Sequence, residues 1–314
     1  MPLSTVSATQ NCKKRTGQIY SFMVDYKVNG GHRYDDERFK ENFIKINYGM
    51  EFPLDKIKKD ERVFIVDFSI ERGDMRELLK ITKNVVWIDH HKTTIEKYKD
   101  FESYIPGIRM TGSGISGASL VWWYFNNNAF YDGMEKVQGL QPQEDEDWDE
   151  DMPLALLLVA DWDTWTFNYR EKTKYFHTAF EMLEYEPWQF GRWFELIKDP
   201  YVLIEQGRLL YQYKQKQAEE YIKSKGFAVE FEGYKCFAVN HGLINSDFFE
   251  SVDDKYDVYI GFAYNGGSKR WSYSLRAAND DVDVSKIAVK YGGGGHKGAA
   301  GFASDKYVLG EMSQ

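Results

Sequence analysis

Cysteine is scarce in this chain, and long apolar segments are missing. Cys12 and Cys236 are the two cysteines among 314 residues, and no Cys-x-x-Cys spacing occurs. We therefore expect neither a disulfide framework nor a zinc–thiolate cluster, which suits a reducing compartment. The longest clean apolar run, Leu154–Ala160, is too short to cross a bilayer. The N-terminal residues are polar and lack the apolar stretch of a secretory signal. These features predict a soluble, cytoplasmic protein with no membrane contact.

Positive charge is in short supply as well. With 40 Lys and Arg against 49 Asp and Glu, the formal net charge is −9. Most proteins that bind duplex nucleic acid gain affinity from a broad basic surface, so a long duplex is disfavoured as a partner. A small anionic substrate remains compatible with this charge, because a bound divalent cation can be the largest local charge in a site.

A strand–helix–strand pattern gives the first indication of the fold. Val63–Phe68 and Val85–Asp89 are continuous apolar runs, as expected of strands buried on both faces of a parallel sheet. Glu71–Thr82, between them, has apolar residues at helical spacing. Both strands end near an aspartate, Asp67 or Asp89, and ligands of open α/β sheets gather at the carboxyl ends of the strands. The sequence predicts an α/β fold with a parallel sheet.

The pattern divides the chain into three parts. Residues 1–185 form the expected N-terminal domain. Residues 186–225 are rich in Trp, Lys, Glu and Gln at helical periodicity, which is typical of a helical connector. Residues 226–314 are expected to form a smaller α/β domain. Its predicted elements are short strands at 227–231, 235–240, 257–264 and 270–276 and a helix at 284–291.

Candidate metal ligands follow three apolar runs. Asp67 taken alone is better explained as a helix cap. Asp89–His91 follows the second strand and contains two adjacent histidines, and neutral imidazole is a common metal ligand. Asp161 and Asp163 follow a third apolar run. Three such endings at one sheet edge are hard to explain by capping, and without a thiolate Mn or Mg fits better than structural zinc.

The C-terminal part carries four consecutive glycines, residues 292–295. Consecutive glycines let backbone N–H groups approach an anion without obstruction by Cβ atoms, and nearby Arg and His side chains could donate to phosphate oxygens. The alternative is a tight interior loop that packs Ala299 and Ala300 against a sheet. The candidate substrate-binding residues are Arg276, Gly293, Gly294, Gly295 and His296.

In order and spacing, these motifs resemble the DHH phosphoesterase superfamily with its C-terminal DHH-associated domain. The superfamily includes RecJ-type exonucleases, nano-RNases, cyclic-dinucleotide phosphodiesterases and family II pyrophosphatases. The tripeptide Asp89–His91 recurs by chance in proteins, but its combination with the glycine-rich segment at the far end is specific. The segments that carry the resemblance are Val66–Ser69, Ile88–His91, Ser116–Ser119, Ala160–Asp163, Ser274–Arg276, Asp283–Ala288 and Gly292–Phe302.

The resemblance implies a metal centre with one or two ions, Mn or alternatively Mg. Asp67 matches the carboxylate that bridges two ions. His90 and a later aspartate match the ligands of the second ion, and the sequence leaves open whether that aspartate is Asp161 or Asp163. Water activated by the ions would attack phosphorus in line.

Two further residues would have catalytic roles by the same resemblance. His91 would orient or polarise the scissile phosphate. Asp89 would hold a histidine in place from behind.

The family's opening motif, His-x-x-x-Asp-x-Asp, is not found where the resemblance places it. That position falls near Cys12–Tyr26, where Lys13–Arg15 replace the expected carboxylates. His32, Asp35 and Asp36 have suitable chemistry at the wrong spacing. Either these three rebuild the site or the first metal is lost, and in the second case Lys13 or Lys14 would supply the missing positive charge.

Together these features predict a Mn-dependent phosphodiesterase or exonuclease-type hydrolase. Its substrate would be a short nucleotide, such as a short single-stranded oligonucleotide or a cyclic dinucleotide, cleaved at a phosphodiester or phosphoanhydride bond. The alternative is a catalytically weak or inactive member of the fold that binds nucleotides as a sensor, sponge or assembly subunit. A purely structural relic is a third interpretation, and a homodimer stays open as the assembly state.

Overall fold

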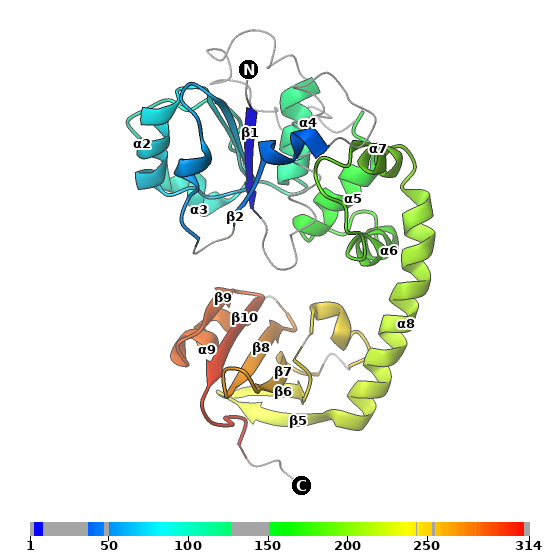
Figure 1. The fold of residues 1–314 in the computed structure, drawn as a ribbon. Coiled ribbons are helices and arrows are strands. Elements are labelled where there is room, and N and C mark those ends of the chain that lie inside the picture. Colours follow the sequence, from blue (N-terminus) through cyan, green and yellow to red (C-terminus); the bar gives the residue numbers. More distant parts are fainter. Residues whose placement is uncertain are drawn as a thin grey trace. The chain divides into compact units, whose positions relative to one another are not determined.

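A computed structural model describes residues 3–8, 37–46, 50–126, 151–242, 244–252, 255–279 and 281–310. The chain forms two compact units, Met1–Leu210 (unit 1) and Tyr211–Gln314 (unit 2), and their boundary lies within α8 (Tyr201–Lys225) (Figure 1). The domain limits predicted from the sequence stay predictions. Helix α8 fills the C-terminal part of the predicted connector.

Unit 1 contains a four-stranded parallel sheet in the order β2-β1-β3-β4. Its strands are β1 (Leu3–Ala8), β2 (Phe43–Ile46), β3 (Arg62–Val66) and β4 (Val85–Ile88). The side chains of β3 from Val63 to Val66 and all of β4 are buried, because both faces of the sheet are covered. The predicted α/β fold with a parallel sheet is confirmed.

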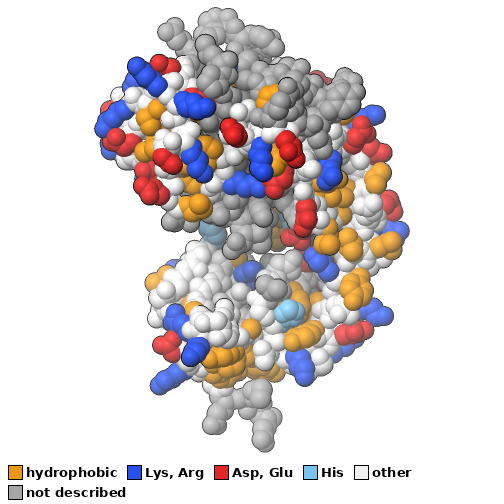
Figure 2. Space-filling model, viewed as in Figure 1, with side chains coloured by type: hydrophobic (Ala, Val, Ile, Leu, Met, Phe, Trp, Pro, Cys, Tyr) orange, Lys and Arg blue, Asp and Glu red, His pale blue; other side chains and the backbone are white. Residues whose placement is uncertain are grey.

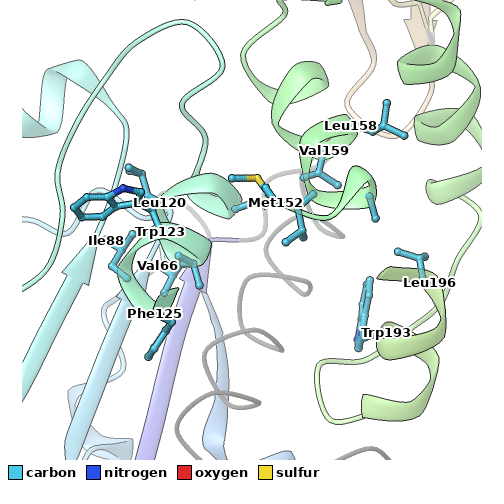
Figure 3. Close-up of a cluster of buried hydrophobic side chains, with 14 of the residues drawn as sticks. Val66, Ile88, Leu120, Trp123, Phe125, Met152, Leu158, Val159, Trp193 and Leu196 are labelled. Atoms are coloured by element: carbon cyan, nitrogen blue, oxygen red, sulfur yellow. The ribbon is translucent and has the colours of Figure 1, made fainter. Parts of the chain in front are cut away.

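The two faces of β3 and β4 belong to different apolar clusters. Odd-numbered residues such as Ile65 and Trp87 pack with α2 (Arg72–Ile81). Even-numbered residues such as Val66 and Ile88 pack in a cluster that contains residues of α4 (Gly117–Asn126) and α5 (Leu154–Asp163), as the close-up in Figure 3 shows. The alternation of side chains along a strand thus divides one apolar run between two layers.

The remaining described helices of unit 1 are α3 (Lys92–Lys97), α4 (Gly117–Asn126), α5 (Leu154–Asp163), α6 (Glu171–Phe180) and α7 (Phe190–Lys198), together with the 3-10 turns η1 (Glu37–Asn42) and η2 (Leu54–Lys56). The third apolar run, before Asp161, is therefore a helix and not a strand tip as expected. A short run that is apolar on all sides fits a buried helix as well as a buried strand, because it has no periodicity.

Helix α8 contributes to the packing of both units. Leu203 and Ile204, near its start, belong to the core of unit 1. Tyr211 Oη donates to Glu250 and Tyr221 Oη donates to the carbonyl of Asn240, so the later turns pack within unit 2.

Unit 2 contains a six-stranded sheet in the order β5-β6-β7-β8-β10-β9, with one parallel pair, β6–β7. Its elements are β5 (Gly226–Phe231), β6 (Tyr234–Val239), η4 (Ser246–Phe249), β7 (Val258–Asn265), β8 (Arg270–Ala277), α9 (Val284–Lys290), β9 (Gly294–His296) and β10 (Ala299–Ser304). The four strands and the helix predicted here all form. Cys236 lies in the core, where burial raises the pKa of its thiol to about 12.

On the visible surface of unit 1, Lys and Arg side chains are interspersed with Asp and Glu (Figure 2). Among the described residues, no helix is both long and apolar enough to cross a membrane.

Candidate metal centre

Asp67 stands at the carboxyl end of β3 in an unusual backbone conformation. Its φ is +52°, in the left-handed region that non-glycine residues rarely adopt. Such a residue costs on the order of 1–3 kcal/mol, and the hydrogen bond from its backbone N–H to the carbonyl of Ile88 (2.9 Å) helps to hold it. Its carboxylate is buried. The capping role considered for Asp67 does not apply to α2, whose N-cap position is Glu71.

His90 presents one ring nitrogen to two carboxylates. Its Nδ1 lies 3.0 Å from the carbonyl oxygen of Ile115, to which it donates, so Nε2 carries the lone pair in the neutral ring. Nε2 lies 3.0 Å from Asp67 Oδ1 and 3.3 Å from Asp163 Oδ2. A hydrogen bond from one ring nitrogen to a carbonyl, with the other facing carboxylates, is the arrangement usual for a histidine that binds metal.

Asp89 fixes the position of His91. The Asp89 carboxylate is fully buried, and its Oδ1 accepts from the backbone N–H groups of His90 (2.9 Å) and His91 (3.3 Å). The same oxygen lies 2.6 Å from His91 Nδ1. His91 is partly exposed, with its Nδ1 3.9 Å from Asp67 Oδ1. One buried carboxylate therefore holds both the turn after β4 and the second imidazole ring.

The structure places Asp163, and not Asp161, beside His90. Two residues along a helix are about 200° apart around its axis, so the two side chains at the end of α5 leave it on opposite sides. The Asp163 side chain is 1% exposed and reaches His90. Asp161 faces the following loop, where Oδ1 accepts from Thr166 Oγ1 (2.6 Å) and from the Asn168 backbone N–H (2.7 Å).

The second oxygen of Asp161 is engaged as well. Oδ2 accepts from the backbone N–H of Tyr169 (3.2 Å) and from Thr173 Oγ1. Four donors from residues 166–173 thus surround one buried carboxylate. This organises the connection between α5 and α6.

The arrangement fits a divalent cation. One ligand atom each from Asp67, His90 and His91 lies within 4.8 Å of the others, and Asp163 Oδ2 lies close to His90 Nε2. Converging carboxylates and an imidazole lone pair repel one another unless positive charge lies among them. The donors are oxygen and nitrogen, with no thiolate among them, as expected for Mn or Mg rather than for structural zinc.

A partly buried cation near Asp89 was not apparent from the sequence. Arg109 donates to the carbonyls of Trp87 (3.0 Å) and Ile105 (2.8 Å), and its guanidinium lies 5.3 Å from the centre of the Trp87 ring. Burial lowers the pKa of Arg109, while the charge of Asp89 acts in the opposite direction. A lone arginine in a short apolar segment carries no signal that separates it from a surface residue.

The loop after Asp163 departs from ordinary backbone geometry. Trp165, Phe167 and Arg170 all have positive φ, at +58°, +52° and +53°. Three non-glycine residues in this region within six positions cost on the order of 1–3 kcal/mol each. The hydrogen bonds to Asp161 offset part of that strain.

In unit 2 the predicted substrate-binding residues lie on neighbouring strands. Arg276 of β8 is opposite Ala299 of β10, which is opposite His296 of β9. Residues directly opposite one another project to the same face of a sheet, so Arg276 and His296 share a face with a small residue between them. The next row on that face, Ser274–Gly301–Gly294, is also small.

The alternative interpretation of this segment as packing holds for one face only. Ala300 and Phe302 belong to the core of unit 2, whereas His296 is exposed. Arg276 Nη1 donates to the carbonyl of Leu275 (2.9 Å) and Nη2 to that of Ile244 (3.4 Å).

The consecutive glycines differ in the space around them. A Cβ on Gly293 would lie 2.2 Å from the carbonyl oxygen of Gly301, and one on Gly295 would lie 2.5 Å from Ala300 Cα. Both glycines therefore allow the segment that leads into and forms β9 to pack closely against β10. A Cβ on Gly294 would meet nothing within 4 Å, so this glycine faces open space.

The segment expected to hold the family's first motif lies outside the described residues. This applies to Cys12–Tyr26 with its basic residues Lys13–Arg15, and equally to His32, Asp35 and Asp36. The number of metal ions therefore stays a prediction.

A solved structure has a similar fold. The pGpG-specific phosphodiesterase PggH from Vibrio cholerae superposes with a TM-score of 0.53 at 13% sequence identity, over 96% of this chain and 93% of that chain. This likeness concerns the fold. The chain has the fold of the DHH phosphoesterases, as the motifs predicted.

Two curated proteins are similar in sequence. Uncharacterized protein R106 of Acanthamoeba polyphaga mimivirus is 28% identical over 270 residues, or 82% of this chain and 56% of that protein. Oligoribonuclease NrnB of Bacillus subtilis is 26% identical over 274 residues, or 82% of this chain and 63% of that protein. The chain thus spans about three fifths of the length of the curated relatives it matches. No family model matches it.

Proposed function

We propose that the protein is a metal-dependent phosphoesterase that hydrolyses a short nucleotide, either a short single-stranded oligonucleotide or a cyclic dinucleotide. The observation that carries the proposal is the convergence of Asp67, His90 and Asp163 at the carboxyl end of the parallel sheet, where both carboxylates lie within 3.3 Å of His90 Nε2. A buried aspartate, Asp89, supports a partly exposed second histidine, His91, at the same edge.

Two similar proteins support the substrate class by the activities for which they are named. One is an oligoribonuclease and the other a pGpG-specific phosphodiesterase. Both names describe short nucleotides. The net charge of −9 also favours a small ligand over a long duplex.

In this proposal Asp67, His90 and Asp163 hold the cation, with Mn or Mg as the ion. A divalent cation there supplies a Lewis acid for a phosphoryl oxygen and lowers the pKa of water. Because His91 Nδ1 donates to Asp89, its Nε2 is the ring nitrogen left to contact a substrate. That nitrogen accepts a hydrogen bond in the neutral ring and donates one in the imidazolium.

Unit 2 contributes phosphate binding in the same proposal. Arg276 and His296 share one face of its sheet and offer N–H donors for phosphate oxygens. A Cβ at Gly294 would meet nothing within 4 Å, so the face of β9 at this glycine is open. Gly293 and Gly295 contribute indirectly. Because they have no Cβ, the backbone of this segment can pass close to β10.

The alternative function is nucleotide binding without turnover. One observation favours it: Lys13–Arg15 stand where the family carries the carboxylates of its first metal site. A protein with one ion or none would bind a dinucleotide tightly and release it unchanged.

Metal content and turnover, measured on one preparation, test the proposal. The purified chain is dialysed against Mn²⁺, analysed for metal by mass spectrometry, and incubated with a 5′-phosphorylated dinucleotide and with a cyclic dinucleotide. We expect at least one ion per chain and mononucleotide products that disappear with EDTA and return with Mn²⁺. Tight dinucleotide binding without product, at full metal occupancy, would establish the alternative function.

A further inference from the structure

The carboxylate of Asp89 is fully buried, and the hydrogen bonds of the site engage only one of its oxygens. Oδ1 accepts from the backbone N–H groups of His90 and His91 and from His91 Nδ1. Oδ2 is buried as well, and no described residue donates a hydrogen bond to it. Removing a carboxylate from water is costly unless opposite charge or further hydrogen bonds compensate it. We therefore expect a cation near Asp89.

The segment of residues 105–110 runs along β4 on the side away from β3. The backbone N–H of Trp87 donates to the carbonyl of Pro106 (2.8 Å), and that of Asp89 donates to the carbonyl of Ile108 (3.0 Å). The pairing is parallel and continues past the end of β4 to Asp89. The backbone on which the Asp89 side chain stands is therefore fixed by this segment.

The segment places the guanidinium of Arg109 on the same face of the sheet as the Asp89 side chain. Arg109 is the residue directly opposite Asp89 in the parallel pairing. Trp87 precedes Asp89 by two residues, so its ring projects to the same face, and the guanidinium lies 5.3 Å from the centre of that ring. Donation to the carbonyls of Trp87 (3.0 Å) and Ile105 (2.8 Å) holds the guanidinium there. Burial lowers the pKa of Arg109 and the charge of Asp89 opposes this effect, so the two groups interact electrostatically.

We propose that Arg109 is a positioning residue for hydrolysis, which compensates the buried charge of Asp89 and so keeps this carboxylate where it holds the His91 ring. The path of contacts runs from Arg109 to Asp89 and from Asp89 Oδ1 to His91 Nδ1 (2.6 Å). It leaves His91 Nε2 for the substrate. The inference rests on the proposed function and adds a residue that lies in none of the motifs.

A double-mutant cycle on kcat measures the coupling of Arg109 to Asp89. Arg109→Gln, Asp89→Asn and the double substitution are compared in dinucleotide turnover at saturating Mn²⁺. Each single substitution should lower kcat by about 10- to 100-fold, the range for groups that support the histidines of a metal site. The double variant should be little worse than Asp89→Asn, because Arg109 then has no carboxylate to hold. Single effects that multiply in the double variant would overturn the proposal. If Arg109→Gln does not fold, the same cycle is run with Arg109→Lys.

A conservative variant and a matched control separate charge from packing. Arg109→Lys keeps the positive charge and should restore most of the kcat that Arg109→Gln loses. Arg72→Gln is the control, because Arg72 also donates to two backbone carbonyls, of Lys97 and Asp100, and lies over the ring of Phe101. Its kcat should equal that of the unmodified chain, and urea unfolding measures the stability of all variants. An equal loss of kcat in Arg109→Lys and Arg109→Gln would show that the charge is not what matters.

Nuclear magnetic resonance reads the same arrangement without turnover. The Nδ1 proton of His91, held by Asp89, should give a downfield histidine N–H signal at low temperature, which is identified by its absence from His91→Gln. The signal should persist in Arg72→Gln and broaden by exchange with water in Arg109→Gln. A signal that is absent from the unmodified chain, or unchanged in Arg109→Gln, overturns the proposal. If the unmodified chain hydrolyses no nucleotide but the signal depends on Arg109, the positioning role stands and the proposed hydrolysis fails.

Discussion

The two candidate sites of this protein are built in opposite ways. The candidate metal centre of unit 1 consists of buried carboxylates and two partly buried imidazoles that are held by hydrogen bonds to a backbone carbonyl or to a neighbouring carboxylate. The glycine-rich edge of unit 2 consists of small residues and an exposed histidine, placed by the pairing of β8, β10 and β9. Metal binding in unit 1 should therefore depend on the charge of the side chains, and the stability of the glycine-rich edge of unit 2 should depend on their size.

Among the substitutions that test this comparison, Asp67→Ala should have the largest effect. Its carboxylate lies near a ring nitrogen of His90 and a ring nitrogen of His91. Removing it should abolish metal binding at micromolar Mn²⁺ and lower kcat/KM by about a thousandfold, the scale of several kcal/mol lost from transition-state stabilisation. Calorimetric titration with Mn²⁺ measures the first effect and dinucleotide turnover the second.

Asp55→Ala is the matched control for that substitution, because Asp55 is an exposed acidic residue of η2 on the same unit. Its metal affinity should equal that of the unmodified chain. Unchanged Mn²⁺ affinity in Asp67→Ala would refute the assignment of Asp67 as a ligand.

Within unit 1, Asp163→Asn and Asp161→Asn should separate metal binding from folding. Asp163→Asn should weaken Mn²⁺ binding by at least the roughly 10- to 100-fold typical of residues that merely support ligands. Asp161→Asn should lower the free energy of unfolding by about 1–3 kcal/mol, because an amide cannot accept all four hydrogen bonds. Urea unfolding and Mn²⁺ titration of both variants decide the matter, and the reverse pattern would make Asp161 the ligand.

In unit 2 the size of one residue should matter more than its chemistry. Gly293→Ala puts a methyl group 2.2 Å from the carbonyl oxygen of Gly301 and should destabilise the unit by about 1–3 kcal/mol. Gly294→Ala meets nothing within 4 Å and should unfold at nearly the same urea concentration as the unmodified chain. Equal destabilisation by both would show that the strand does not pack as described.

The smallest expected effect is that of His296→Ala. Loss of one exposed N–H donor to phosphate should raise KM about tenfold while leaving metal content and stability unchanged. Steady-state kinetics with a dinucleotide and elemental analysis of the variant check both statements. Loss of metal in His296→Ala would contradict the division of labour between the two units.

Much of the fold could be predicted from the sequence. Val63–Val66 and Val85–Ile88 are apolar without interruption because β3 and β4 are covered on both faces. The strands of unit 2 follow from short β-type runs between Gly and Asn turns. The candidate site was partly predictable for the same reason, since Asp67 and His90 follow strands that end at one edge of a parallel sheet.

The third part of the site could not be predicted in the same way. Residues 154–160 are apolar at every position, so their periodicity reveals neither that they form a helix nor which side of it faces the sheet. The choice between Asp161 and Asp163 depends on how α5 rotates about its axis as it packs, and that rotation is set by contacts with α4, α6 and α7.

The sequence by itself determined the α/β class, the strands β3 to β8, and the motifs that resemble the DHH phosphoesterases, because burial and strand ends impose local patterns on residues. The tertiary structure alone decided that Asp163 faces His90 and that Asp161 ties down a strained loop. Each of these depends on the direction in which a side chain leaves its backbone, which is fixed by packing between elements far apart in the chain.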